Sequence, residues 1–148
     1  LTVFVLYYII MVSLFQGIEV KLNLSSGSEA DLKHFKLSFV VKPSPPVGPI
    51  EFYDIQRTSV SINWKPSKDD GGAPIKEYIL ECKEKTRSSW SKVAKVKADI
   101  TSYCAQNLKD KQEYIFRVTA ENEVGQSESL VSETVTLKSQ FGKYIIVT

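Results

Sequence analysis

Apolar and polar residues alternate most clearly between Glu113 and Asn122. A period of two residues is typical of a β-strand that buries one face. The positions predicted to face a core are Tyr114, Phe116, Val118 and Ala120. The pattern ends at Asn122-Glu-Val-Gly125, a turn signal, so we expect the chain to reverse there.

Six further segments carry strand patterns separated by turn residues. They cover residues 50–55, 59–65, 75–84, 90–97, 100–107 and 133–138. In the second and third strands of the set, the inward positions are Val60, Ile62, Trp64, Tyr78 and Leu80. The cluster Asp69–Pro74 is a strong turn signal between these two strands. Seven short strands with regular turns predict an all-β sandwich.

Residues 1–18 form an apolar segment that carries no charge before Glu19. Three interpretations fit it: a secretory signal, a membrane-spanning helix, or non-native sequence such as a translated intron. A signal normally starts with a basic segment, which is absent, and a span needs about 20 apolar residues. If the segment is ordered alone, we expect a helix. The first residue is Leu rather than Met, so we expect the chain to be a fragment.

Between the apolar segment and the sandwich lie an expected strand and a linker. Phe35, Leu37 and Phe39 alternate with polar residues, which predicts one amphipathic strand. Residues 43–49 contain four prolines and predict a stiff extended linker, because proline cannot donate a backbone hydrogen bond. The same run could fill a groove that binds polyproline, but its place beside a domain boundary favours the linker.

Several motifs in this order resemble the fibronectin type III family over residues 46–138, which implies a seven-stranded immunoglobulin-like β-sandwich. Trp64 matches the buried tryptophan of the second strand. Leu108, six residues before Tyr114, matches the tyrosine corner, in which a buried phenol bonds to the backbone. Ala120-Glu-Asn-x-x-Gly125 is similar to the end of the sixth strand and its turn. The expected structural core is Trp64, Tyr78, Leu80, Leu108, Tyr114, Phe116 and Val118.

A second set of motifs is similar to fibronectin domains of the titin, twitchin and projectin group of giant muscle proteins. It consists of Asp70-Gly-Gly-Ala-Pro-Ile75, Tyr78-Ile-Leu-Glu81 and Trp90. Those domains often have a proline soon after the sixth strand, where this chain has Ser129. The resemblance implies that residues 19–42 are the tail of a preceding immunoglobulin-like domain, whose last strand would be disordered or would pair with another edge. Residues 139–148 are expected to be a C-terminal extension.

This resemblance also implies a function: a non-enzymatic protein-interaction and mechanical spacer module, one of many in series along the sarcomere. Partners would be myosin or other thick-filament proteins. Candidate contact residues are exposed cations, namely Lys76, Lys83, Lys85, Arg87 and Arg117. The alternative is an extracellular module of a receptor or adhesion protein, with the apolar segment as signal or membrane anchor. Whether the full-length protein carries a kinase cannot be read from this stretch.

Composition and candidate chemistry exclude several function classes. The net charge of +2 and the mixing of acids with bases give no basic cluster for nucleic acid. The single histidine, His34, lies outside the expected domain, so we expect no catalytic or metal site. Asp69-Asp70 is interpreted as part of a turn rather than a calcium ligand. We therefore expect no cofactor and no small-molecule substrate. The turn after the sixth strand lacks the Arg-Gly-Asp of integrin-binding fibronectin modules.

Two cysteines, Cys82 and Cys104, are expected to remain free thiols. The resemblance places them on opposite sheets about 10 Å apart, too far for a disulfide. Cys104 also has the opposite parity to its neighbours and should point outward. Few cysteines fit a cytoplasmic, sarcomeric location. Asn23-Leu24-Ser25 is a glycosylation sequon, however, and would report exposure to the secretory pathway.

Overall fold

The computed structural model describes residues 7–12, 19–23 and 36–138. The predictions for residues 1–6, 13–18, 24–35 and 139–148 lie outside these ranges. Residues 7–12 form a short helix, the conformation expected for the apolar segment. Among the described residues, no helix has the length and apolar character needed to cross a bilayer.

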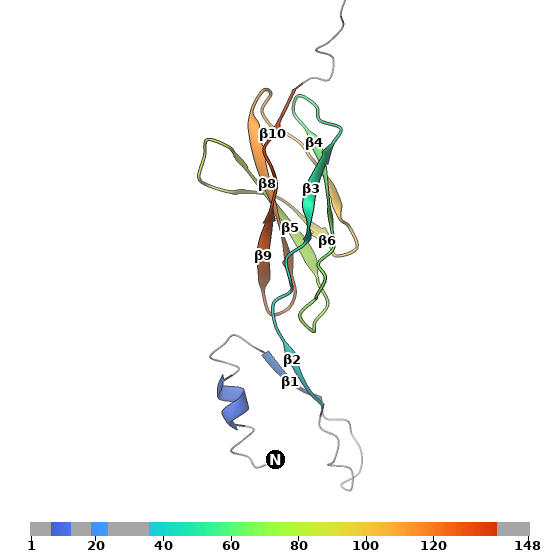
Figure 1. Cartoon of the computed structure of the whole chain (residues 1–148), viewed down its shortest axis with the longest axis vertical. Helices are drawn as coiled ribbons and strands as arrows, with labels where there is room; N and C mark the ends of the chain where they lie inside the picture. Colours follow the sequence, from blue (N-terminus) through green and yellow to red (C-terminus); the bar gives the residue numbers. More distant parts are fainter. Residues whose placement is uncertain (1–6, 13–18, 24–35, 139–148) are drawn as a thin grey trace, which may run out of the picture.

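The centre of the molecule is a β-sandwich made of two antiparallel sheets (Figure 1). One sheet has the order β3–β4–β7, formed by Val47–Tyr53, Val60–Lys65 and Ser102–Ala105. The other contains β5, β6, β8, β9 and β10, formed by Glu77–Glu84, Ser91–Lys97, Glu113–Glu121, Gln126–Val131 and Val135–Thr136. In it β8 pairs with β5 on one side and with β9 and β10 on the other. The predicted all-β fold class is confirmed.

The core lies between the sheets and is formed by alternate residues of each strand. Leu80, Phe116 and Val118 are fully buried, and Trp64 packs edge-on against Tyr78 with ring centroids 5.8 Å apart. Leu108 is partly buried against this cluster. Burying one large apolar side chain stabilises the folded state by about 1.5–3 kcal/mol. These residues therefore dominate the stability of the sandwich.

The loop before β8 is held by Tyr114. Its ring is buried, and its hydroxyl accepts a hydrogen bond of 3.1 Å from the backbone N–H of Lys109. The next residue back, Leu108, donates its own N–H to the carbonyl of Thr58 at 2.9 Å. The phenol therefore satisfies a backbone donor where the chain crosses between the sheets, as the resemblance to a tyrosine corner implied.

Most strands keep within about two residues of their predicted bounds, and the first and last strands of the sandwich differ most. The first strand starts at Val47 rather than Ile50, and its pairing with β4 shifts between Val47 and Glu51. The shift accommodates Pro49, which has no N–H to donate.

The prediction of the last strand at residues 133–138 is wrong for most of its length. The chain pairs with β8 already from Gln126 to Val131, and β10 is only a two-residue continuation. The cause is a tight turn, in which the N–H of Asn122 donates to the carbonyl of Gly125. Ser129 consequently lies within β9, opposite Thr119, and not in a loop.

The amphipathic strand expected near residue 37 is β2, Lys36–Val40. It pairs antiparallel with β1, Glu19–Asn23, so of the two expected outcomes the structure shows pairing with another edge. The two strands lie beyond one end of the sandwich (Figure 1). The expectation that they are the tail of a preceding immunoglobulin-like domain stays a prediction.

Candidate interaction surface

Four of the five candidate contact cations lie near one or the other end of β5. Lys76 directly precedes this strand, whereas Lys83, Lys85 and Arg87 lie at or beyond its other end. Eight residues of extended chain separate those ends by about 27 Å. Arg117 lies on β8 opposite Glu81 of β5, which places it near Lys83. The structure therefore brings Lys83 and Arg117 together and leaves Lys76 apart.

Lys83 and Arg117 converge on the ring of Trp90, which directly precedes β6. The Arg117 guanidinium carbon lies 4.4 Å from the ring centroid, and the Lys83 ammonium lies 5.2 Å from it. Arg117 also donates a 2.6 Å hydrogen bond to the carboxylate of Glu81. We call Glu81, Lys83, Trp90 and Arg117 the Trp90 cluster. Cation–π contacts at exposed sites are worth about 0.5–1 kcal/mol each, enough to orient these side chains.

An exposed apolar residue adjoins the Trp90 cluster. Val131 of β9 is the register partner of Arg117, so both side chains leave the outer face of the sheet. Val131 is 53% exposed. The surface thus combines Trp90 and Arg117, two residue types that are enriched at protein–protein interfaces, with a lysine and an aliphatic group.

The other two candidate cations at this end of the sheet, Lys85 and Arg87, form ion pairs. Lys85 pairs with Glu113 at 3.2 Å, and Arg87 pairs with Glu84 at 3.2 Å. Glu84 also accepts a 2.7 Å hydrogen bond from Lys109. The hydrogen bond from Lys109, and secondarily the charges of Arg87 and Lys109, hold the pKa of Glu84 below its ordinary value. Exposed pairs contribute little stability each, about 0–1 kcal/mol.

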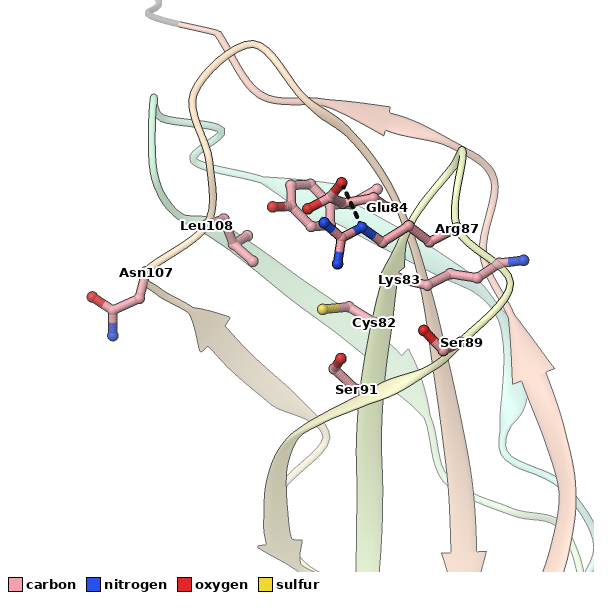
Figure 2. Close-up of a pocket in the computed structure, with 9 residues that line it drawn as sticks. Cys82, Lys83, Glu84, Arg87, Ser89, Ser91, Asn107 and Leu108 are labelled. Carbon is pink, nitrogen blue, oxygen red and sulfur yellow. Dashed lines mark ion pairs between the residues drawn. The ribbon is translucent and has the colours of Figure 1, made fainter.

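A small pocket lies beside these ion pairs, between the end of β5 and the loop before β8. Its volume is about 200 Å³ and its lining includes Cys82, Ser89, Ser91 and Leu108. Figure 2 shows the Arg87–Glu84 pair above Cys82 and the two serines in that view. Burial, and then the charge of Glu84, raise the pKa of the Cys82 thiol. The thiol is therefore protonated and weakly nucleophilic at neutral pH.

The pocket is small for a ligand site. It is smaller than the roughly 300–1,000 Å³ typical of ligand pockets. Within residues 7–12, 19–23 and 36–138, no group of three or more His, Cys, Asp or Glu side chains is placed to hold a metal ion. Cys82 is buried and Cys104 is exposed, and both are free thiols. The outward direction predicted for Cys104 is the one observed.

Sequence reasoning missed two members of the Trp90 cluster, Trp90 and Glu81, and the adjoining Val131. Trp90 was identified only as part of a family pattern, and Glu81 as part of a strand. Strand parity carried a usable signal, because Glu81 and Lys83 share one face of their strand and Arg117 has the outward parity of its own. The register that puts Glu81 opposite Arg117 is a product of tertiary pairing.

Comparisons with known proteins agree with this architecture. The profile of the fibronectin type III domain matches residues 38–135. Titin of Drosophila melanogaster is 35% identical over 123 residues, which cover 83% of this chain and 1% of that protein. The titin homolog of Caenorhabditis elegans is 33% identical over 109 residues, 73% of this chain and 1% of that protein. Protein sidekick-2 of Mus musculus is 33% identical over 98 residues, 64% of this chain and 4% of that protein.

The solved structures show the same relationship. The crystal structure of domains A168–A170 from titin superposes with a TM-score of 0.62 at 27% identity, covering 81% of this chain and 49% of that one. The chain spans about one hundredth of the length of the two titin relatives that it matches.

Proposed function

The chain belongs to the fibronectin type III family, and from that premise we propose that it is a non-enzymatic interaction and spacer module of a titin- or twitchin-like sarcomeric protein. The similarity to the two titin relatives supports this assignment. The modules of such a protein would bear tension in series and present sheet faces to neighbouring proteins.

The spacer role is supported by where the chain enters and leaves the sandwich, which is at opposite ends of β8. The incoming chain bonds to Asn122, just after β8 ends, where the Asn122 side chain donates to the Val41 carbonyl. The outgoing chain bonds just before β8 begins, where the N–H of Leu137 donates to the carbonyl of Gln112. The chain thus enters at one end of the sandwich and leaves at the other (Figure 1). Modules linked this way extend end to end.

We propose the Trp90 cluster with Val131 as the contact surface for a protein partner of the thick filament. Trp and Arg are enriched among residues that dominate binding energy. The cation–π contacts and the Arg117–Glu81 bond already orient these groups, which lowers the entropy lost on binding.

Cosedimentation with purified myosin filaments tests this surface. We expect the wild-type chain to sediment with the filaments and Arg117→Ala to weaken binding by at least about tenfold, as for a dominant interface residue. Lys76→Ala is the matched control, because Lys76 is an exposed cation beside the other end of β5. Absence of wild-type binding would refute myosin as the partner. Equal binding by both variants would refute the Trp90 cluster as the surface.

The alternative is an extracellular module, and the sequon at Asn23 gives the specific observation for it. Asn23 is the last residue of β1, beyond the apolar segment. In the sarcomeric proposal the chain never meets the glycosylation machinery. Native protein should then keep its mass after endoglycosidase treatment, and a loss of mass at Asn23 would favour the extracellular role.

A further inference from the structure

We call the segment that leads into the sandwich, residues 40–46, the linker, and its backbone is bound to the turn between β4 and β5. The N–H of Val41 donates to the carbonyl of Gly71 at 2.8 Å, and the N–H of Ser44 donates to the carbonyl of Asp69 at 2.9 Å. The Ser44 hydroxyl in turn accepts a 3.0 Å hydrogen bond from the N–H of Asp69. Linker and turn are thus joined by reciprocal hydrogen bonds, as adjacent strands would be.

Asn122 connects this contact to the turn after β8. The nitrogen of its side-chain amide acts as a donor and the oxygen as an acceptor. Its amide nitrogen donates to the carbonyls of Val41 at 2.6 Å and Asp70 at 2.9 Å. Its amide oxygen accepts from the N–H groups of Val124 at 2.9 Å and Gly125 at 3.1 Å. The residue is only 3% exposed, so its hydrogen bonds are shielded from water.

Three glycines make room for the linker at this place. A Cβ on Gly71 would lie 2.2 Å from the Val41 carbonyl oxygen, and one on Gly72 would lie 2.9 Å from that of Phe39. A Cβ on Gly125 would lie 3.1 Å from the side chain of Lys42. Any side chain at Gly71 would therefore displace the linker backbone. The two turns that meet the linker both use glycine at the point of closest approach.

Burial shows that the linker is part of the sandwich rather than a free tether. Val40 is 2% exposed, and Pro43 and Pro46 are also buried. Prolines at these positions also restrict the linker to extended conformations. A segment that is stiff, partly buried and bonded at three points has one preferred direction.

We propose that the side chain of Asn122 locks residues 40–44 onto the turns after β4 and β8, and that this lock sets the direction in which the preceding chain leaves the domain. We call Val41, Ser44, Asp69, Gly71 and Asn122 the linker lock. The proposal goes beyond the spacer role, since it makes the joint a rigid part of the module. It also means that these turns are occupied by the chain's own linker, which leaves the sheet faces for partners.

Residue-resolved hydrogen exchange on the whole chain tests the lock with Asn122→Asp. Aspartate keeps an oxygen for Val124 and Gly125 but replaces the donor with an oxygen that repels the Val41 and Asp70 carbonyls. We expect the Val41 amide to exchange at least about tenfold faster, as expected for local opening after loss of a buried donor. The amides of Ile62 and Leu80 in the core should keep their protection.

Ser127→Ala is the matched control within the same hairpin. The Ser127 hydroxyl accepts from the N–H of Ala120 at 3.0 Å and is not part of the linker lock. We expect no change at the Val41 amide in this variant. Equal acceleration in both variants, an unchanged Val41 rate in Asn122→Asp, or acceleration shared by Ile62 would each overturn the proposal.

A linker-side variant covers the case in which Asn122→Asp does not fold. Ser44→Ala removes the acceptor of the Asp69 N–H without touching the core. We expect the Asp69 amide to exchange at least about tenfold faster, again by local opening. An unchanged Asp69 rate, or a wild-type Val41 amide that exchanges like an unstructured chain, would overturn the lock.

Discussion

At the scale of single residues, Trp64 has the largest expected effect on stability. Its ring is 4% exposed and packs against Tyr78. We expect Trp64→Ala to lower the free energy of unfolding by about 3–5 kcal/mol. Domains of this kind have about 5–15 kcal/mol in total, so the variant should be largely unfolded or nearly so. The measurement is the denaturant midpoint followed by circular dichroism.

Trp64→Phe tests the packing of the aromatic ring separately from the indole N–H group. The indole Nε1 is buried without a hydrogen-bond partner among the described residues. Phenylalanine should therefore keep most of the packing and lose only about 1–2 kcal/mol. Equal losses for the two Trp64 variants would contradict the view that ring packing dominates.

Tyr114→Phe tests the hydrogen bond at the loop before β8. The change leaves the N–H of Lys109 without the phenol oxygen that now accepts it at 3.1 Å. We expect a loss of about 1–3 kcal/mol in the free energy of unfolding, the cost of leaving a partly buried donor unpaired. Tyr103→Phe is the control, because the described residues offer its hydroxyl no hydrogen bond, and it should change stability little. The prediction fails if both variants unfold at the same denaturant concentration.

At the scale of elements, Glu84 links the end of β5 to two loops and should make stability depend on pH. The hydrogen bond from Lys109 lowers its pKa in the folded state below the ordinary value of 4.5. The carboxylate therefore stabilises the fold above about pH 4.5, and this contribution is lost as the pH falls through the folded pKa. We expect Glu84→Gln to remove part of the decrease in stability on acidification.

The measurement for Glu84 is the denaturant midpoint at neutral and at acidic pH. Wild type should lose more stability between the two conditions than Glu84→Gln does. Glu128→Gln is the control, because Glu128 is exposed and makes no ion pair within the described part of the chain. An identical loss on acidification in wild type and Glu84→Gln would argue against a role for the Lys109 and Arg87 contacts.

At the scale of the whole molecule, the two thiols should differ in reactivity. Cys104 should react in the folded protein, and Cys82 should react mainly when the domain unfolds. Cys104 is exposed, whereas Cys82 is buried with a raised pKa. Alkylation by iodoacetamide should therefore modify Cys104 quickly in the native protein and Cys82 only slowly, because the thiolate is the reacting form. Mass spectrometry of digested protein gives the rate at each site.

Denaturant should bring the two alkylation rates together along the unfolding transition followed by circular dichroism. This coincidence is expected because Cys82 pairs with both neighbouring strands and is released when the sandwich opens. Cys104→Ser provides a chain in which only Cys82 can react. Rapid native labelling of Cys82 would show that the pocket gives reagents free access to the thiol.

The sequence by itself determined the strands, most of the core and the family. Alternation along β8 identified Tyr114, Phe116 and Val118, because strand parity alone decides which side chains face the opposite sheet. Its weakest point was the last strand, placed at residues 133–138. The tight turn at Asn122 starts pairing at Gln126, and β9 carries a weak apolar pattern because much of it is only half-buried.

Only the tertiary structure decided which surface residues act together. Arg117 and Glu81 are 36 positions apart, and strand register alone brings them together at 2.6 Å. Asn122 and Val41 are 81 positions apart, and nothing in either segment specifies their hydrogen bond. The alternation of apolar and polar residues along a strand indicates which of its faces is buried. A contact between distant segments depends on how the whole chain folds back, so the Trp90 cluster and the linker lock arise only in the assembled sandwich.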